Sequence, residues 1–293
     1  MTERTAMIIT QINGGLGNQM FQYAAGRALA LRHGVELALD TRIFDGATQF
    51  GLGLNHFAHA AREGLPPEMP PERRQNRLQY LIWRGLKLKP YLFRENGLSY
   101  NAGFDNLGDG AYLKGYWQSE RYFKAVEGTI RGDFRIVSSP SPENAAILAE
   151  LTRLPAISLH IRRGDYVNNS RTNATHGTCT LDYYARAVEL IAGRMTEKPV
   201  IFTFSDDPAW VRENLVLPYE MRVMEHNDSN HNYEDLRLMS ACRHHIIANS
   251  SFSWWGAWLN PSPDKIVVSP ARWFADPQMV NDDIWPDSWI KLT

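Results

Sequence analysis

The second half of the chain alternates regularly between short apolar runs and helical patterns. Runs with strand character fall at 157–163, 200–205, 221–225, 245–248 and 265–269. Helical patterns separate them near 181–195, 208–215, 232–243 and 253–259. Strands that alternate with helices pair in parallel, because each crossover helix returns the chain to the same end of the sheet. The pattern therefore predicts a Rossmann-like α/β domain.

The first half opens in a similar way. The expected order is a strand at 6–12, a glycine turn at 13–19, a helix at 20–33, a strand at 35–41, a strand at 111–116 and a helix opening at 117–123. A chain of 293 residues exceeds what one hydrophobic core usually serves, so two domains are expected. The polar, Pro-rich segment 137–143 is the best boundary. We expect an α/β domain over residues 1–138 and a Rossmann-like domain over 139–293, with the extreme C-terminus packing back on the first domain.

The strand at 157–163 carries His160, Arg162 and Arg163, and Asp165 follows it closely. Adjacent guanidinium groups repel each other, so two of them at the carboxyl end of a buried strand require an anionic partner. Ligands of open α/β sheets lie at this end of the strands. The pattern indicates a diphosphate site, and a salt-bridge cluster that ties the strand to its loop is the alternative.

Two further strand ends carry polar residues. Asp206 and Asp207 follow the strand at 200–205. Asp206 could accept hydrogen bonds from guanine or a ribose, whereas Asp207 stands before Pro208 and equally suits a helix N-cap. After the strand at 245–248 comes a small polar run that would place donors beside a helix start, namely Asn249, Ser250, Ser251, Phe252 and Ser253. A nucleoside diphosphate fits these strand ends together.

The glycine turn before the first helix is a weaker anion signal. Gly15 and Gly17 lie in a strand-turn-helix context that suits an anion, but Met20 stands where GxGxxG requires its third glycine. A tight turn without a ligand is equally consistent with this pattern.

The composition excludes several classes of protein. Lys and Arg number 31 against 32 Asp and Glu, so no global charge favours nucleic acid. Cys179 and Cys242 lie far apart without CxxC spacing, which argues against a zinc site and a disulfide framework. The N-terminus lacks the features of a signal peptide, and no apolar run has the length of a membrane helix. We therefore expect a cytoplasmic protein with no obligate protein partner.

The segment 73–94 is basic and contains no acid. Its seven Lys and Arg residues are interleaved with apolar and aromatic residues, among them Trp83, Tyr91 and Phe93. Such a segment can bind an anionic membrane surface reversibly, which would place the protein peripherally on the inner face of the plasma membrane. The alternative is a helix that packs its apolar face inward and solvates its basic face.

Five motifs together resemble the bacterial α-1,2-fucosyltransferases of glycosyltransferase family 11. They are the segments 13–23 (NGGLGNQMFQY), 115–120 (GYWQSE), 160–166 (HIRRGDY), 204–207 (FSDD) and 249–258 (NSSFSWWGAW). The resemblance implies a GT-B-like fold with two Rossmann-like domains whose parallel sheets face a cleft. It also implies GDP-fucose as donor, a galactose-terminated glycan as acceptor, transfer to the 2-hydroxyl with inversion, and no cofactor or metal.

The resemblance also implies roles for individual residues. His160 would contact guanine, Arg162 the β-phosphate, and Asp206 or Asp207 the base. The serines at 250–253 would bind the phosphates, with Arg163, Asn249 and Phe252 beside them. The turn that contains Gly15, Gly17, Asn18 and Gln19 would close over the diphosphate and fucose, with Asn18 in a catalytic role.

Three residues remain candidates for the base that accepts the proton of the acceptor hydroxyl. Asp165 is the first candidate, and His176 and Glu120 are the others. No Asp-x-Asp occurs in the sequence, so the usual carboxylate pair for a divalent ion is missing, and Arg162 and Arg163 are the candidates to meet charge on the leaving phosphate. The alternatives are another linkage, another GDP-sugar, or a carbohydrate-binding protein that uses its tryptophans as stacking platforms.

Overall fold

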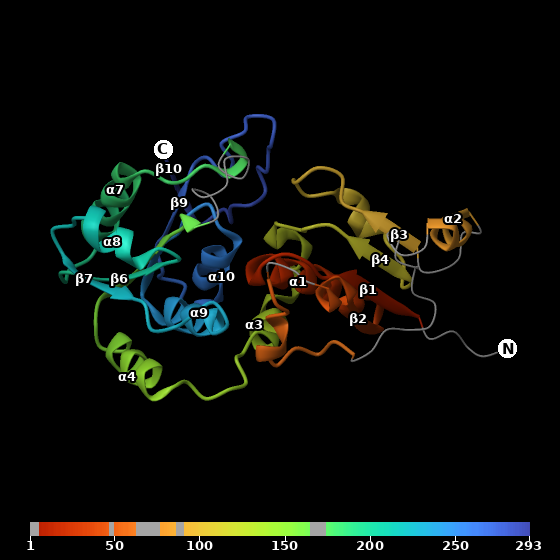
Figure 1. Cartoon of the computed structure of the whole chain (residues 1–293), viewed down its shortest axis with the longest axis horizontal. Coiled ribbons are helices and arrows are strands. Elements are labelled where there is room, and N and C mark those ends of the chain that lie inside the picture. The colour runs from red at the N-terminus through yellow and green to blue at the C-terminus, as the bar shows by residue number, and fades with distance from the viewer. Residues whose placement is uncertain (1–5, 47–49, 63–76, 86–90, 165–173) are drawn as a thin grey trace. The chain divides into compact units, whose positions relative to one another are not determined.

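The computed structural model describes residues 6–46, 50–62, 77–85, 91–164 and 174–293, with the side chains at 83 and 84 left out. The chain divides into two compact units, Met1–Arg135 and Ile136–Thr293 (Figure 1). Asp165 and the basic residues at 73–76 and 86–90 lie outside the described residues.

The N-terminal unit is built on a four-stranded parallel sheet in the order β2-β1-β4-β3. Its main elements are β1 (Met7–Gln11), α1 (Leu16–His33), β2 (Glu36–Asp40), α2 (Arg77–Gly85), β3 (Tyr91–Arg94), β4 (Ala111–Lys114) and α3 (Glu127–Asp133). Helix α1 packs directly on the sheet, since a Cβ on Gly26 would lie 2.8 Å from the Thr10 hydroxyl and 2.9 Å from Leu37. The predicted β-α-β opening is confirmed.

The structure differs from the expectation at two places in this unit. The helix expected from 117 is replaced by two short 3₁₀ turns, Glu120–Tyr122 and Lys124–Val126. Trp117 has a φ of 57°, which an α-helix does not allow, so the helix cannot open there. The basic segment 73–94 is also not a single helix, because Tyr91–Arg94 forms the edge strand β3.

Helix α2 buries little of its apolar surface. Tyr80 is buried and accepts a hydrogen bond from the Arg94 guanidinium at 3.0 Å. Leu78, Leu81 and Ile82 are exposed by 69%, 59% and 50%. The expectation of an inward apolar face is therefore wrong for these three residues. None of the helices in the described part of the chain has the length and apolarity needed to span a membrane.

The C-terminal unit contains a six-stranded parallel sheet in the order β10-β9-β8-β5-β6-β7. Its strands are β5 (Ala156–Ile161), β6 (Val200–Ser205), β7 (Glu220–Met224), β8 (His244–Ile246), β9 (Val267–Pro270) and β10 (Ile290–Leu292). Its helices are α4 (Pro142–Leu151), α7 (Leu181–Ala192), α8 (Pro208–Asn214), α9 (Asn232–Ala241) and α10 (Ser251–Leu259). The predicted Rossmann-like alternation is confirmed. The end of the chain forms β10, which pairs with β9 at the edge of this sheet.

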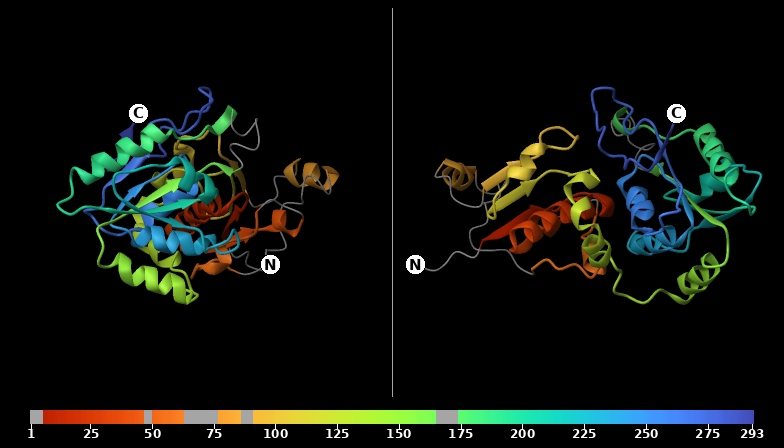
Figure 2. Two further views of the ribbon diagram at one scale, coloured as in Figure 1. Left: turned by 60° about the vertical axis from the view of Figure 1, so that its left-hand side comes forward. Right: turned by 180° about the vertical axis from the view of Figure 1, so that it is seen from behind.

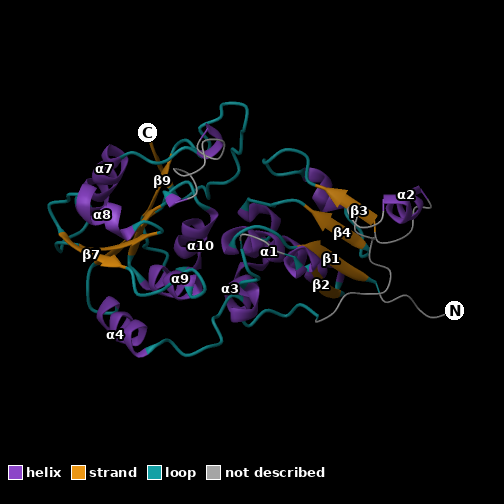
Figure 3. Cartoon of the chain, in the orientation of Figure 1, coloured by secondary structure: helices purple, strands orange, loops and turns teal. Residues whose placement is uncertain are grey.

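Helices cover both faces of this sheet (Figures 2 and 3). On one face, Ile157, Leu159 and Ile161 of β5 pack in one cluster with residues of α7 and α8. On the other face, Phe202 and Phe204 of β6 pack with residues of α4 and α9. The period-two pattern of β5 thus directs its apolar residues to the α7 side and leaves the intervening positions, which include His160, on the α9 side.

The tryptophans near the C-terminus belong to the core. Trp254 and Trp255 are fully buried, and Trp258 and Trp289 are exposed by 2% and 7%. Their rings contact one another, with Trp254 and Trp258 stacked at 6.0 Å and 13°. The Trp254 indole donates a hydrogen bond to the Ile284 carbonyl at 2.7 Å. These residues cannot serve as surface platforms for a sugar.

Candidate functional site

Each sheet has one point where the strand order reverses direction. In the C-terminal unit the chain runs from β5 outward through β6 to β7, and then returns to the other side of β5 with β8. In the N-terminal unit the corresponding point lies between β1 and β4. Loops at such a point leave the sheet toward opposite faces, which makes the carboxyl ends of these strands the usual ligand site of an open α/β sheet.

Arg162 follows β5 at the reversal point and is held by a carboxylate from the neighbouring strand. Its Nη1 lies 3.0 Å from Oδ2 of Asp206, which follows β6. The other oxygen, Oδ1, accepts a hydrogen bond from the Arg163 backbone N–H at 2.9 Å. Gly164 makes this arrangement possible, because a Cβ there would lie 2.7 Å from Asp206 Oδ2. Asp206 therefore fixes the position of Arg162, and both of its oxygens have partners within the protein.

Arg163 lies in a different environment from its neighbour. Its guanidinium carbon stacks 3.6 Å from the centre of the Trp210 ring, and its Nε lies 3.6 Å from Asp207 Oδ2. Asp207 also caps α8, where it accepts a hydrogen bond from the Trp210 N–H at 3.2 Å. The N-cap interpretation of Asp207 is confirmed, and Arg163 is anchored against the first turn of α8.

His160 is a neutral, buried histidine next to this pair. It is 5% exposed, and its Nδ1 is buried without a hydrogen-bond partner. Burial lowers the pKa of His160 to about 4, an effect that Asp206 opposes and Arg162 reinforces. Its ring lies 5.8 Å from the ring of Phe252 at the start of α10. An uncharged imidazole with one unsatisfied nitrogen is suited to hydrogen bond a nucleobase.

In the polar run after β8, some side chains hold the loop together, and the backbone at the start of α10 is suited to bind an anion. Asn249 is 4% exposed, and its amide nitrogen donates to the carbonyls of His176 at 2.8 Å and Trp273 at 3.2 Å. The Ser253 hydroxyl donates to the Ser250 carbonyl at 3.3 Å. These two side chains organise the loop. The Ser250 side chain at the N-cap of α10 makes no capping hydrogen bond to this helix, which begins at Ser251. Backbone N–H groups at a helix start suit an anion.

The glycine turn of the N-terminal unit is fixed by Gln19. This residue is fully buried, and its side-chain nitrogen donates to the carbonyls of Gly14 and Gly51, both at 2.8 Å. Its side-chain oxygen accepts the Gly53 N–H at 2.9 Å. Gly15 forms the N-cap of α1, and Gly17 is buried in the first turn of that helix. Gln19 thus holds the turn together, and its amide is committed to these backbone partners.

Asn18 connects the turn after β1 to the loop after β4. Its Oδ1 accepts a hydrogen bond from Gln118 Nε2 at 2.7 Å. Both residues lie at the reversal point of the N-terminal sheet. Asn18 is therefore placed where a ligand of this sheet would bind.

The candidate bases have different environments. Asp165 lies outside the described residues. Glu120 is 8% exposed and forms an ion pair with Lys124 at 2.5 Å, so its charge already has a partner. The His176 ring contacts Phe274 at 5.4 Å, and its carbonyl accepts the Asn249 hydrogen bond.

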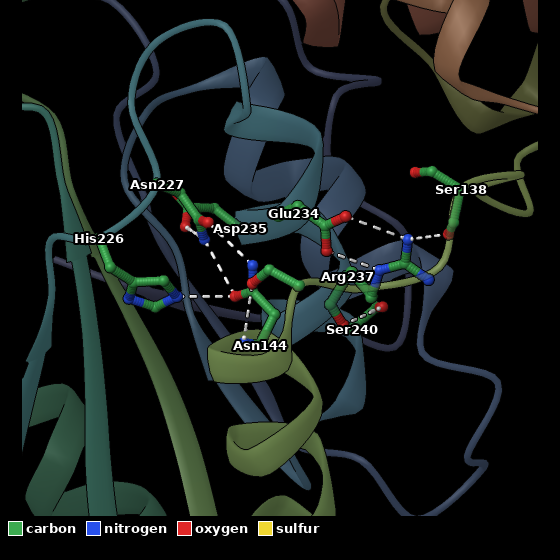
Figure 4. A network of polar contacts seen from close by, with 9 residues as sticks. Ser138, Asn144, His226, Asn227, Glu234, Asp235, Arg237 and Ser240 are labelled. Atoms are coloured by element: carbon green, nitrogen blue, oxygen red, sulfur yellow. Dashed lines mark hydrogen bonds and ion pairs between the residues drawn. The ribbon is translucent and has the colours of Figure 1, made fainter.

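A partly buried polar network lies beyond the end of β7 (Figure 4). Asn227 donates to Asp235 Oδ1 at 2.8 Å, and Asn144 of α4 donates to the Asn227 side-chain oxygen at 2.9 Å. His226 contacts the Asn144 side-chain oxygen at 2.7 Å. Burial raises the pKa of Asp235 to about 7, which Asn227 opposes and Glu234 reinforces. The network joins α4, α9 and the loop between β7 and α9.

Comparisons with known proteins identify the family. The model of glycosyl transferase family 11 matches residues 93–293. The chain belongs to this family. An α-1,2-colitosyltransferase of Escherichia coli is 32% identical, over 98% of this chain and 99% of that protein. The O-antigen biosynthesis glycosyltransferase WbnK of Escherichia coli is 31% identical, over 96% and 99%.

A solved structure shows the same fold. The α-1,6-fucosyltransferase NodZ soaked with GDP-fucose superposes with a TM-score of 0.50 over 88% of this chain and 94% of that chain, at 15% identity. The likeness supports the GT-B type of fold, two α/β units with parallel sheets, as predicted. This member of family 11 is a glycosyltransferase.

Several residues of these two edges were absent from the predicted site. Glu95 directly follows β3, and Gln118 directly follows the strained Trp117. An acid after a strand is the kind of signal that singled out Asp206, but Glu95 adjoins a basic segment that was interpreted as a helix. Trp210 and Gly164 act through packing, which no sequence pattern indicates. Among the residues that the structure describes, no group of three His, Cys, Asp or Glu side chains could hold a metal ion.

Proposed function

We propose that this family 11 enzyme transfers L-fucose from GDP-fucose to the 2-hydroxyl of a terminal galactoside, with inversion and without a metal. The observation that carries the proposal is the arginine at the reversal point of the C-terminal sheet. Arg162 is oriented there by Asp206 and follows β5, the strand that adjoins β8, and α10 begins shortly after β8. A guanidinium and the backbone N–H groups of a helix start together suit a diphosphate.

The same residues fit the charge changes of the reaction. The acceptor oxygen attacks the anomeric carbon on the face opposite to the nucleotide. The bond from that carbon to the phosphate oxygen breaks, its electron pair goes to the β-phosphate, and a base accepts the acceptor's proton. A preorganised cation that meets the new phosphate charge lowers the barrier, and Arg162 would supply it. The absence of Asp-x-Asp from the sequence supports a route without a divalent ion.

The nucleobase would lie near His160. A buried, neutral imidazole with an unsatisfied Nδ1 is suited to a single hydrogen bond to guanine. Asp206 already accepts from Arg162 and the Arg163 N–H, so we assign it first to the orientation of Arg162. Each carboxylate oxygen has two lone pairs, so a contact from Asp206 to guanine is compatible with this role.

Transfer of colitose is the second candidate, and a relative at 32% identity with that activity favours it. Colitose is fucose without its 3-hydroxyl, so a GDP-colitose donor would differ from GDP-fucose at one position of the sugar. The same arginine and helix start would serve both donors. Only the contact to the 3-hydroxyl separates the two functions.

The test is a direct comparison of donors. Purified protein is incubated with lactose and either GDP-fucose or GDP-colitose, with and without EDTA, and GDP release and the product linkage are measured. The proposal expects GDP-fucose to have the higher kcat/KM, an α-1,2 product, and full activity in EDTA. A preference for GDP-colitose would establish the second candidate. Loss of activity in EDTA that magnesium restores would contradict the metal-free route, and binding of lactose without GDP release would indicate a carbohydrate-binding protein.

A further inference from the structure

The reversal point of the N-terminal sheet carries a second set of polar groups. Strands β1, β4 and β3 are adjacent in this sheet, and hydrogen bonds connect the segments that follow their carboxyl ends. Gln118 after β4 donates to Asn18 after β1, at 2.7 Å. Glu95 after β3 accepts hydrogen bonds from the backbone of the loop after β4. This edge, defined by Asn18, Gln118, Glu95 and Tyr116, is called the N-terminal edge below.

Glu95 is held firmly in place on the N-terminal edge. Its Oε2 accepts the Tyr116 N–H at 2.6 Å, and both carboxylate oxygens lie 3.0 Å from the Trp117 nitrogen. Gly115 leaves the space for this approach, because a Cβ there would lie 2.4 Å from Glu95 Cβ. The carboxylate is therefore fixed by two backbone donors and by the lack of a side chain at position 115.

The backbone that holds Glu95 is strained. Among the described residues, Trp117 is the only one other than glycine with a positive φ, at 57°. This conformation costs on the order of 1 kcal/mol and persists where the surroundings enforce it. Trp117 is fully buried and stacks on Phe93 at 5.9 Å and 17°. The aromatic core under the edge thus holds the loop in the conformation that directs two N–H groups at Glu95.

The chemistry of this carboxylate suits a sugar hydroxyl. A carboxylate offers about four acceptor sites, so the backbone donors do not use all of them. Burial raises the pKa of Glu95 to about 7, although both backbone hydrogen bonds lower it. Tyr116, whose backbone N–H binds the Glu95 carboxylate, is 42% exposed, and a tyrosine ring can stack on a pyranose. The side chains of Asn18 and Gln118, one hydrogen bond apart, add amide groups to the same edge.

We propose that Glu95 is an acceptor-binding residue that accepts a hydrogen bond from a hydroxyl of a neutral galactoside, with Tyr116 stacked against the sugar. This inference rests on the proposed function for the identity of the ligand. It differs from the sequence-based candidates for acceptor chemistry, because Glu120 is paired with Lys124 whereas the Glu95 carboxylate receives hydrogen bonds from the backbone N–H groups of Tyr116 and Trp117.

The test is a cycle of enzyme variants and deoxygenated acceptors. Wild type and Glu95→Gln are assayed at saturating GDP-fucose with a galactoside and with its monodeoxy analogues. Glu95→Gln should raise the acceptor KM about tenfold or more and leave the Kd for GDP, measured by calorimetry, within twofold. For wild type, the one deoxy analogue that lacks the bound hydroxyl should have a higher KM than the parent galactoside. For Glu95→Gln, the KM of this analogue should be close to that of the parent galactoside. Glu127→Gln is the matched control, since Glu127 pairs with Arg131 on α3 of the same unit, and its acceptor KM should not change.

Further measurements keep the outcomes distinct. Tyr116→Ala removes an exposed ring, so it should fold normally and raise the acceptor KM severalfold even if Glu95→Gln does not fold. An unchanged acceptor KM in folded Glu95→Gln or in Tyr116→Ala overturns the proposal. The proposal is also overturned if each deoxy analogue raises the KM by the same factor in wild type and in Glu95→Gln. Binding of the galactoside followed by saturation-transfer NMR needs no turnover. A wild type that binds the galactoside through Glu95 but transfers no fucose would refute the proposed function alone.

Discussion

The buried carboxyl group of Asp235 makes the stability of the protein depend on pH. Burial raises its pKa from 3.8 to about 7, with Glu234 adding to the rise and the Asn227 amide opposing it. A carboxyl group with a raised pKa binds its proton more tightly in the folded protein than in the unfolded chain. The free energy of unfolding therefore falls as the pH rises from the unfolded pKa to the folded pKa. Asp235→Asn removes this titration and keeps the size of the side chain.

The expected magnitude follows from the two pKa values. A difference of about three units corresponds to about 4 kcal/mol, of which about 2.5 kcal/mol falls between pH 5 and pH 8. Any cost of fitting the Asn amide into the network with Asn144 and Asn227 is the same at both pH values. The stability of the variant relative to wild type should therefore rise by about 2.5 kcal/mol from pH 5 to pH 8.

Urea unfolding followed by tryptophan fluorescence measures this difference, because seven of the nine tryptophans lie in the C-terminal unit. Asp228→Asn, on the loop that precedes α9, is the matched control. His231 lowers the pKa of the Asp228 carboxyl, so its removal should bring no gain at high pH. An equal difference between Asp235→Asn and wild type at both pH values would refute the reasoning.

Three further predictions concern the donor site and the surface of α2. Arg162→Ala should lower kcat by about three orders of magnitude with the circular dichroism spectrum unchanged. Arg162→Lys should restore little activity, because an ammonium group lacks the forked donor geometry of a guanidinium. A loss of kcat below tenfold would contradict the assignment. Asp206→Asn should weaken GDP binding by about 1.5 to 3 kcal/mol in calorimetry, and wild type that binds GDP and IDP equally would show that Asp206 does not read guanine. We also propose that the protein is cytoplasmic and attaches peripherally to the membrane, so it should co-sediment with anionic vesicles at low salt only. Replacing the exposed Leu78, Leu81 and Ile82 of α2 by Gln should abolish this binding. If the wild type does not bind at low salt, α2 is a solvated helix.

The sheet of the C-terminal unit was predictable because its signals are local. The alternation of Ile157, Leu159 and Ile161 carries the strand, and the carboxyl ends of parallel strands meet at one edge whatever the connections are. The sequence therefore predicts that Arg162 and Asp206 are neighbours. In the structure, Nη1 of Arg162 lies 3.0 Å from Oδ2 of Asp206.

The rest of the site depends on contacts between distant segments. The sequence shows an acid at 206 but not that both of its oxygens are engaged, one of them by the Arg163 backbone N–H. It shows a serine at 253 but not that its hydroxyl donates to the Ser250 carbonyl. Glu95 was missed for the same reason, since the strained Trp117 that holds it takes its conformation from an aromatic core and not from local preference. Packing overrides propensity at such positions.

The two reversal points also have a consequence for folding kinetics. The pairing of β5 with β8 joins positions 157 and 244, which are 87 apart, whereas its pairing with β6 joins 157 and 201, which are 44 apart. Closing a chain segment twice as long costs about 0.6 kcal/mol more entropy. In the N-terminal unit, β1 pairs with β4 across 103 positions, from Ile9 to Tyr112. The strand pairs that create the candidate sites are thus among the longest-range pairings of their sheets, so we expect these edges to form late in folding, after the neighbouring β-α-β segments.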